Sequence, residues 1–565
     1  MPEQPVYYGS DAIADVLRAH GFRHIALTPG ASFRGLHDSL VNYLGNVNPE
    51  MVLCLHEEHA VAVAHGYAKV SGTCLPVALH SNVGLMHAAM AIYNAWCDRV
   101  PMIILGATGP LDAERRRPWI DWIHTSQDQA QVIRSYCKWD DQPISAAGAV
   151  HALLHGIQMT QSYPQAPVYI NCDTELFEAP CDLSPEAMQS RTWPRIDAGA
   201  LSPEALEHVV GMLQGRSRIL CLFGRMERTA QAFSARIDLI EAIDATVVTD
   251  LRTGSTFPTQ HPNHLAPGTL MPTSGVIDAV READLILSFD WIDLGGLFRQ
   301  AFGEPRAPQP VISFSPDHGL HNGWSKDGCE PAATTSSFAI HPDQAIRQLA
   351  VQLQVAPASQ SLRPWQAAPR AAGPLSVQDL GHVMYDTLGG EAVTLIRTPI
   401  SWQSHFWPFS DALSHLGFDG GGGIGSGLGM AIGAALALRD QARLPVAVLG
   451  DGDYLMGVSA LWTAVHHHIP LLIVIANNRS FFNDEVHQER VAITRGRDVN
   501  NKGVGIRIED PDPDLAGLAR AQGALAAGPV TDVAELERAL EWRVQKCTQV
   551  RLWSWMSMSR DRIEG

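Results

Sequence analysis

Two short polar motifs in the last third of the chain carry side chains suited to binding a metal ion. Gly450-Asp451-Gly452 is followed by Asn477-Asn478, and the aspartate and the second asparagine are 27 positions apart. A hard cation such as Mg²⁺ prefers carboxylate and amide oxygens, with phosphate oxygens and water completing its octahedral shell. The flanking glycines let the backbone approach a phosphate closely. Each motif by itself is equally typical of an ordinary turn, so the inference depends on how the chain positions the pair.

The segments around these motifs predict that both lie at one edge of a parallel sheet. A strand is expected over 445–449, a helix over 458–467 and a second strand over 470–476. In such a unit the two strands run parallel, and their carboxyl ends open on the same edge. Asp451 and Asn478 then meet where open α/β sheets bind ligands. This placement favours a site for Mg²⁺ and phosphate over two unrelated turns.

A glycine-rich stretch, FDGGGGIGSGLGMAIGAALAL (418–438), precedes this unit. Gly420, Gly422 and Gly425 match the GxGxxG spacing of dinucleotide-binding loops. That motif should follow a strand, whereas the preceding DALSHLGFD has no strand pattern. A nicotinamide cofactor is therefore disfavoured, which leaves either a different ligand or a loop without one.

A second candidate site lies near the start of the chain, in VLCLHEEHAVAVAHGYAKVSG (52–72). Glu57 and Glu58 fall where an apolar, strand-like run changes into a helix-like run rich in alanine and valine. Carboxylates are rarely buried unless they are paired or have a function. The alternative is that both belong to the first turn of a helix, where negative charge complements the helix dipole and faces water.

The elements that must position these residues form three α/β units. A chain of 565 residues is too long for one core. Apolar runs alternate with helical segments in each unit, which predicts doubly wound parallel sheets. We expect a first domain over 1–185, a middle domain over 190–353 and a third domain over 377–548. The proline-containing segment 354–376 is typical of a linker, and the final SMSRDRIEG has no packing pattern.

Composition excludes several other classes of function. The formal net charge of −18 argues against nucleic-acid binding, which requires clustered Lys and Arg. The nine cysteines form no CxxC pair, which argues against a zinc or disulfide framework and indicates a reducing compartment. The sequence has no signal-peptide pattern and no run of about 18 apolar residues. We therefore expect a cytoplasmic protein without a membrane span.

The GDG and NN spacing, together with HGYA at 65–68, resembles the thiamine-diphosphate-dependent decarboxylase, carboligase and acetolactate-synthase superfamily. The segments HSNVGLMHAAMAIYNAWCDRVPMIILGA and APVYINCD look most like benzoylformate decarboxylases. The resemblance implies a pyrimidine-binding first domain, a middle domain and a diphosphate-binding third domain. It also implies dimers or tetramers in which two subunits share each active site.

The resemblance assigns cofactor and metal roles to residues of the third domain. The residues implied are Gly422, Ile424, Gly450, Asp451, Gly452, Asp453, Asn478 and Ser480. Asp451, Asn478 and Ser480 would hold Mg²⁺ through a carboxylate, a side-chain amide and a backbone carbonyl, respectively. Ile424 would support the thiazolium ring, and the Gly422 carbonyl would accept a hydrogen bond from the 4′-amino group.

Two acidic positions are interpreted through the same resemblance. The family has a Glu ten residues before the Tyr of its GYA motif, and with Tyr67 as that tyrosine the match is Glu57. Glu57 would act on N1′ of the aminopyrimidine from a desolvated position, while Glu58 would be a solvated first-turn residue. Asp453 departs from the family, which usually has Ser or Ala there, and a carboxylate near phosphates is costly unless it meets a partner.

The substrate motifs are less specific than the cofactor motifs. His80 matches the histidine that transfers protons on the substrate of benzoylformate decarboxylases, while Ala31 replaces their substrate-binding serine, with Ser32 beside it. The second catalytic histidine of that family has no counterpart in FDWIDLGGLFR. His124, in the segment expected over the reacting carbon, and Asp484, placed like an acid of pyruvate decarboxylases, are further catalytic candidates.

The predicted activity is decarboxylation of an aryl or branched 2-oxo acid through an enamine intermediate, which the same chemistry can ligate to an aldehyde. Four aromatic residues would suit a bulky apolar substituent, although aromatic side chains are more often plain packing: Trp122, Trp402, Phe481 and Phe482. The alternatives are an acetolactate-synthase-like carboligase, a lyase of 2-hydroxyacyl compounds and a non-catalytic cofactor-binding paralogue. The presence of Glu57, Asp451 and Asn478 favours an enzyme.

Overall fold

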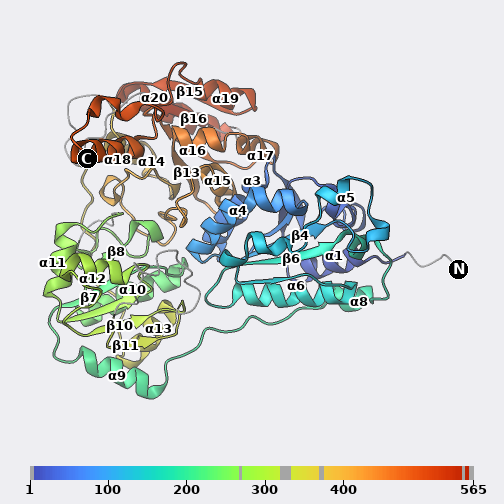
Figure 1. The fold of residues 1–565 in the computed structure, drawn as a ribbon. Helices are drawn as coiled ribbons and strands as arrows, with labels where there is room; N and C mark the ends of the chain where they lie inside the picture. Colours follow the sequence, from blue (N-terminus) through green and yellow to red (C-terminus); the bar gives the residue numbers. More distant parts are fainter. Residues whose placement is uncertain (1–5, 266–269, 318–332, 368–374, 550–553, 559–565) are drawn as a thin grey trace.

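The computed structural model of the protein describes residues 6–265, 270–317, 333–367, 375–549 and 554–558. These residues form three α/β domains, each built on one sheet whose strand pairs are all parallel (Figure 1). The predicted fold class is confirmed. In Figure 1 the first domain (blue to cyan) lies against the third (orange to red), with the middle domain (green to yellow) below the third.

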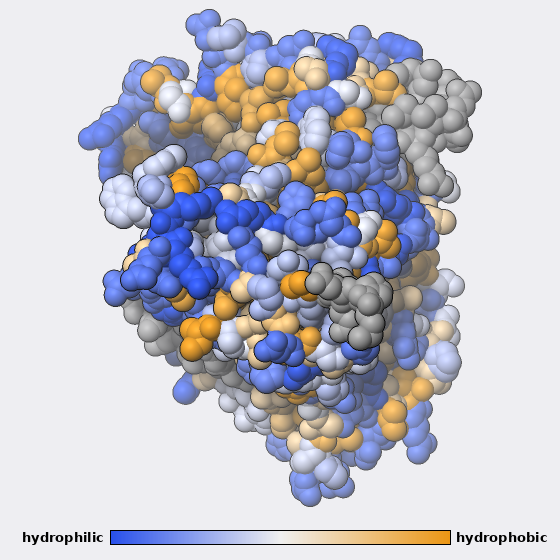
Figure 2. Space-filling view, turned by 90° about the vertical axis from the view of Figure 1, so that its right-hand side faces the viewer, coloured by the Kyte–Doolittle hydropathy of each residue, from blue (hydrophilic) through white to orange (hydrophobic). Residues whose placement is uncertain are grey.

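The surface on the side of the first domain is mixed in polarity. Figure 2 shows hydrophobic residues scattered among hydrophilic ones over this face. Among the helices in the described part of the chain, none combines the length and the apolar character that crossing a bilayer requires. The buried apolar side chains instead fill the layers between each sheet and its helices.

The first sheet has the strand order β2-β1-β3-β4-β6-β5. Its strands are β1 (His24–Leu27), β2 (Glu50–Leu53), β3 (Pro76–Leu79), β4 (Met102–Thr108), β5 (Trp139–Asp141) and β6 (Pro167–Asp173). Its helices are α1 (Gly9–Ala19), α2 (Arg34–Asp38), α3 (Glu57–Ser71), α4 (Ser81–Asp98), α5 (Ile120–Ile123), α6 (Ala146–Gln161), α7 (Thr174–Glu178) and α8 (Pro185–Met188). One apolar layer joins the sheet to α1 and α6, and another joins it to α3 and α4. The doubly wound order puts the ligand edge at the carboxyl ends of the strands.

The middle sheet has the order β11-β10-β9-β7-β8. Its strands are β7 (Ile219–Phe223), β8 (Thr246–Thr249), β9 (Leu285–Phe289), β10 (Val311–Phe314) and β11 (Ser336–Phe338). Its helices are α9 (Pro203–Leu213), α10 (Ala230–Ile243), α11 (Ser274–Glu282), α12 (Leu294–Phe302) and α13 (Pro342–Gln352). The following segment, 354–367, has no helix or strand. It lies along the middle domain, where the backbone amides of Ser359 and Gln360 donate to Glu241.

The third sheet has the order β12-β13-β14-β16-β15. Its strands are β12 (Val393–Arg397), β13 (Leu444–Gly450), β14 (Leu472–Ala476), β15 (Leu525–Val530) and β16 (Ser554–Met558). Its helices are α14 (Val377–Leu388), α15 (Gly427–Leu438), α16 (Asp451–Met456), α17 (Ala460–His466), α18 (Phe482–Thr494), α19 (Leu515–Ala521) and α20 (Val533–Gln549). Two helices, α16 and α17, replace the single helix expected over 458–467. The first of them begins directly at Asp451, because Gly450 leaves β13 in an extended conformation.

The end of the chain contributes to the third sheet, which the sequence pattern did not indicate. β16 lies between β14 and β15 and pairs with both. Without it the facing backbone groups of those two strands would lack partners. The third sheet therefore extends past residue 548, into the start of the SMSRDRIEG tail, and residues 559–565 of that tail lie outside the described part.

Two glycine-containing helices, α3 and α15, cross in close contact and join the first domain to the third. A Cβ atom at Gly66 would overlap the carbonyl oxygen of Met430, and one at Gly433 would overlap that of Val63. The apolar core continues through the crossing from one domain into the other. Small residues four positions apart on both helices could have indicated this close crossing, but the sequence analysis did not use them.

We expect Gly433→Ala to destabilise the protein. Alanine is favoured over glycine by about 1 kcal/mol within a helix, so any loss must come from the crossing. Overpacking a close contact costs about 1–3 kcal/mol, which should lower the thermal unfolding midpoint. The matched control is Gly211→Ala in α9, where an added Cβ atom meets nothing within 4 Å. A Gly433→Ala midpoint equal to or above that of the control would contradict the packing described.

Candidate active site

Asp451, Asn478 and Ser480 come together at the carboxyl ends of β13 and β14. Gly450, the last residue of β13, pairs with Ala476, the last residue of β14. The backbone amide of Ser480 donates to Asp451 Oδ2 at 3.2 Å and to Asn478 Oδ1 at 3.0 Å. The expected juxtaposition is therefore present. The metal role of the three residues stays a prediction.

Asp451 lies in a setting that suits a bound cation. Its side chain is buried and accepts hydrogen bonds from backbone amides, among them those of Gly452 and Ser480. Burial raises the pKa of this carboxyl to about 6, although those amides oppose the shift. A buried carboxylate that lacks a cationic side chain as partner is stabilised by a metal ion. One carboxylate, one amide and one carbonyl oxygen match the donor preference of Mg²⁺.

One glycine in each of the two loops leaves its backbone open to a ligand. At Gly450 and Gly422 an added Cβ atom would meet nothing within 4 Å. Gly422 has a φ of +68° and Gly425 a φ of +103°, backbone conformations that residues other than glycine rarely adopt. Ile424, between them, is 37% exposed although it is apolar. An exposed isoleucine beside open backbone is compatible with the proposed thiazolium support.

Asp453 has the partners that its position near phosphates requires. Its Oδ1 accepts hydrogen bonds from the amides of Gly425 at 2.7 Å and Gly427 at 3.3 Å. Its Oδ2 lies 3.4 Å from Arg397 Nε, and the same guanidinium also pairs with Asp419. The side chain thus joins α16 to the glycine loop, and Arg397 offsets its charge. The sequence did not reveal Arg397, which is contributed by β12.

Glu57 is the first residue of α3 and follows β2 at the ligand edge of the first sheet. Its side chain is buried, whereas that of His87 beside it is largely exposed. The two groups meet at 3.1 Å between Glu57 Oε2 and His87 Nδ1. On the other side Gly84 leaves room for the carboxyl group, because a Cβ atom there would lie 3.3 Å from Oε1.

Glu58 differs from its expected role as a solvated first-turn residue. It is half-buried, and burial together with the charge of Asp453 raises its pKa. A Cβ atom at Gly425 would lie 3.9 Å from Glu58 Oε1, so the residue faces the glycine loop of the third domain. The α3–α15 crossing brings the two domains together at this point, which no local pattern could indicate.

His80, Ser32 and His124 form a polar cluster: His80 directly follows β3, Ser32 lies in the segment after β1, and His124 is the C-cap of α5. Ser32 Oγ lies 2.9 Å from His80 Nδ1, and the two imidazole rings of His80 and His124 are 4.7 Å apart in an edge-to-face arrangement. Burial lowers the pKa of His80, and the nearby His124 adds to this. The structure thus brings the two predicted histidines together. Ser32, beside the unusual Ala31, supplies the hydroxyl that holds His80.

The other substrate candidates are dispersed. Asp484 is exposed on the first turn of α18. Phe481 packs on Gly452, and Trp122, in α5 two positions before His124, is 80% exposed. Trp402 was expected to line a substrate pocket, but it is 1% exposed and belongs to the apolar core of the third domain. This expectation was wrong because aromatic composition does not distinguish a pocket wall from a core.

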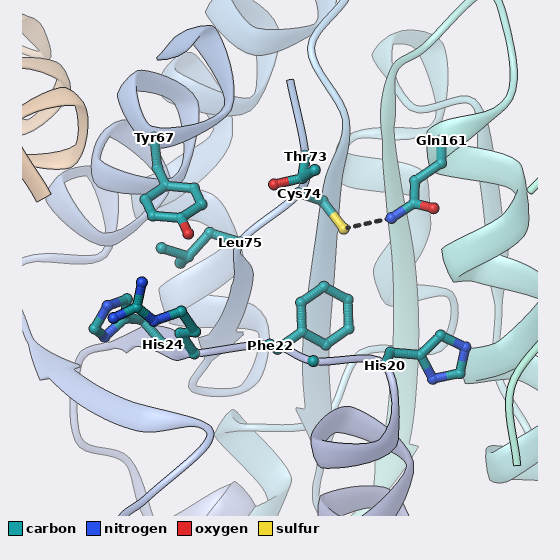
Figure 3. Close-up of a pocket in the computed structure, with 10 residues that line it drawn as sticks. His20, Phe22, His24, Tyr67, Thr73, Cys74, Leu75 and Gln161 are labelled. Atoms are coloured by element: carbon teal, nitrogen blue, oxygen red, sulfur yellow. Dashed lines mark hydrogen bonds between the residues drawn. The ribbon is translucent and has the colours of Figure 1, made fainter. Parts of the chain in front are cut away.

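A separate pocket lies at the opposite edge of the first sheet (Figure 3). The residues that line it include His24, the first residue of β1, and Thr73, Cys74 and Leu75, which precede β3. Figure 3 shows the hydrogen bond that the Gln161 side-chain amide donates to Cys74 Sγ, and the ring of Tyr67 above His24. The pocket thus opens at the amino ends of the strands, away from Glu57 and His80.

Comparison with known families covers all three domains. The family described as "Thiamine pyrophosphate enzyme, N-terminal TPP binding domain" matches residues 8–132. The central domain of the same enzymes matches residues 206–318, and their C-terminal TPP binding domain matches residues 399–550. These segments contain both loops of the third domain and the Glu57 and His80 edge of the first.

Individual relatives extend over most of the chain. Benzoylformate decarboxylase of Pseudomonas aeruginosa is 26% identical over 486 residues, which are 83% of this chain and 85% of that protein. The acetolactate synthase large subunit of Haemophilus influenzae is 23% identical over 543 residues, or 91% of this chain and 88% of that protein.

Solved structures share the fold over nearly the full length. A thiamine diphosphate-dependent 4-hydroxybenzoylformate decarboxylase of Rhodococcus jostii RHA1 superposes with a TM-score of 0.79 at 20% identity and covers 99% of this chain and 100% of that one. Benzoylformate decarboxylase of Polynucleobacter necessarius has the same TM-score at 18% identity, with 98% of each chain covered.

Proposed function

The chain belongs to the thiamine pyrophosphate enzyme family, and on that premise we propose a more specific function. It decarboxylates a 2-oxo acid with an aryl or branched substituent, using thiamine diphosphate and Mg²⁺. The observation that carries the proposal is the convergence of Asp451 and Asn478 on Ser480 at neighbouring strand ends. A screen for CO₂ release from 2-oxo acids, with cofactor and Mg²⁺ present, tests it directly.

The residues of this chain divide the work between two domains. Asp451, Asn478 and the Ser480 carbonyl would hold Mg²⁺ and, through it, the diphosphate. Gly450 and Gly452 flank the aspartate, and the open backbone at Gly450 would allow close approach of a phosphate. When bound, thiamine diphosphate supplies the nucleophilic carbon and the electron sink for loss of CO₂. Ile424 would support the thiazolium ring, and the Gly422 carbonyl would accept a hydrogen bond from the aminopyrimidine.

The residues proposed to transfer protons lie in the first domain. Glu57 holds and returns a proton at N1′ of the aminopyrimidine, since a buried carboxyl at a strand end suits a proton shuttle. Burial keeps His80 neutral near pH 7, because it lowers the pKa of the imidazole. A neutral His80 can accept a proton from the substrate or donate one to it, and Ser32 fixes its orientation. His124, beside His80, would supply the second imidazole, for which FDWIDLGGLFR offers no counterpart.

Asp484 is proposed to act on the substrate only in the assembled enzyme, because it is exposed in the single chain. We propose dimers or tetramers in which Glu57 of one subunit and Asp451 of another serve the same cofactor, in the cytoplasm. The similarity to an acetolactate synthase keeps carboligation of the bound intermediate to an aldehyde, or cleavage of a 2-hydroxyacyl compound, as the second candidate. A non-catalytic paralogue is disfavoured because Glu57, Asp451 and Asn478 are all present.

We expect benzoylformate and 4-methyl-2-oxopentanoate to exceed pyruvate in kcat/KM. Each CH₂ group that a small substrate fails to bury forgoes about 0.8 kcal/mol. A substrate site to which Trp122 or Phe481 contributes an apolar wall would therefore favour a large substituent by at least about tenfold. Steady-state comparison of the three acids provides the measurement. His80→Ala should slow all three without changing C2 hydrogen exchange of the cofactor. A clear preference for pyruvate would favour the acetolactate-synthase-like function.

A further inference from the structure

Helix α4 presents two residues, one turn apart, to the carboxyl group of Glu57. Gly84 leaves space beside Oε1, and His87 places Nδ1 at 3.1 Å from Oε2. Residues three positions apart lie on the same face of a helix. The Glu57 carboxyl group is therefore held on one side by a hydrogen bond and left uncrowded on the other.

His87 is itself held in place although its side chain is 58% exposed. Its ring stacks on that of His56, with centroids 4.9 Å apart and planes inclined by 18°. His56 is the N-cap of α3, and its Nδ1 accepts a hydrogen bond from the Glu58 amide at 3.1 Å. A capped helix start thus fixes His56, His56 fixes His87, and His87 contacts Glu57.

We propose that His87 is a positioning residue for Glu57, which keeps the carboxyl group aimed in both of its protonation states. This inference rests on the proposed function, in which Glu57 acts on N1′ of the aminopyrimidine. The bond to His87 engages Oε2. Oε1 then remains for the cofactor, since the missing side chain of Gly84 avoids a tight contact there. Without that bond Oε2 would lose the side-chain partner that fixes the orientation of the carboxyl group.

An imidazole suits this position because a proton shuttle changes charge during each cycle. An ionised Glu57 can only accept a hydrogen bond, which requires a proton on His87 Nδ1. A protonated Glu57 can donate, and the other tautomer of neutral His87 can then accept at Nδ1. One side chain therefore remains bonded to Glu57 in either state, and the partially exposed ring can exchange its proton with water between them.

The test compares His87→Asn with His87→Leu in the holoenzyme. The two replacements have nearly the same shape, but only the asparagine amide can donate to Oε2 or accept from it. We expect His87→Leu to slow hydrogen–deuterium exchange at C2 of the bound cofactor at least tenfold, whereas His87→Asn stays within threefold of the unmodified protein. Calorimetry should give unchanged thiamine diphosphate affinity for both variants, since neither contacts the diphosphate.

Two control variants distinguish a failure of the positioning role from a failure of the proposed function. His208→Leu removes an exposed histidine that is bonded to Ser336 in the middle domain, and exchange should be unchanged. Glu57→Gln reports on the proposed function itself. If Glu57→Gln slows C2 exchange but His87→Leu does not, or if His87→Asn is as slow as His87→Leu, the positioning role is contradicted. If Glu57→Gln leaves C2 exchange unchanged, the proposed function itself is contradicted, whatever the result for His87.

Discussion

Glu57→Gln is expected to slow hydrogen–deuterium exchange at C2 of bound thiamine diphosphate by about 10²–10⁴-fold, the usual contribution of a general acid–base residue. The amide has the same shape as the carboxyl group but cannot hold or return a proton at N1′. Turnover should fall in parallel. Cofactor affinity should change little, because the anchoring groups lie on the third domain. Exchange can be followed by NMR of the cofactor after acid quenching.

The matched control for this variant is Glu58→Gln. Glu58 is half-buried, and burial together with the charge of Asp453 raises its pKa. Replacing it by a neutral amide removes a like-charge repulsion, so we expect full exchange rates and unchanged or slightly higher stability. Equal losses from the two neighbouring substitutions would show that Glu57 has no special role.

Asp451→Ala is expected to weaken binding of thiamine diphosphate with Mg²⁺ by at least about a hundredfold. Even substitution of residues that support metal ligands costs about 10–100-fold in metal affinity, and Asp451 is the one charged ligand proposed here. Asn478 and Ser480 would remain as neutral donors, too weak to hold the cation against water. Titration calorimetry of the cofactor-free protein with thiamine diphosphate in excess Mg²⁺ measures the effect.

The control is Asp386→Ala, which removes an exposed carboxylate from α14 of the same domain. It changes the net charge equally and should leave cofactor affinity unaltered. A second measurement replaces Mg²⁺ by a chelator, which should abolish the difference between Asp451→Ala and the unmodified protein. Unchanged affinity in Asp451→Ala would remove the metal site from the third domain.

The amino-acid sequence by itself determined the fold class and the relation between GDG and NN. Short apolar runs alternating with helical segments are local patterns, and they specify parallel α/β units without reference to distant contacts. A β-α-β connection then obliges the two strand ends to share one edge, so Asp451 and Asn478 had to meet. The helix of this βαβ unit was less well predicted. Two helices stand in its place, and the first begins at Asp451, directly after Gly450 in an extended conformation.

Tertiary structure alone decided which side chains are buried and which polar groups face one another. Packing within the third domain pairs Arg397 with Asp453 and puts Trp402 in the core. Glu58 faces the glycine loop of that domain because α3 and α15 cross where glycines permit close approach. Contacts between residues hundreds of positions apart leave no periodicity in the chain. They depend on how whole surfaces fit together, so burial and charge pairing at the site became visible only in the folded molecule.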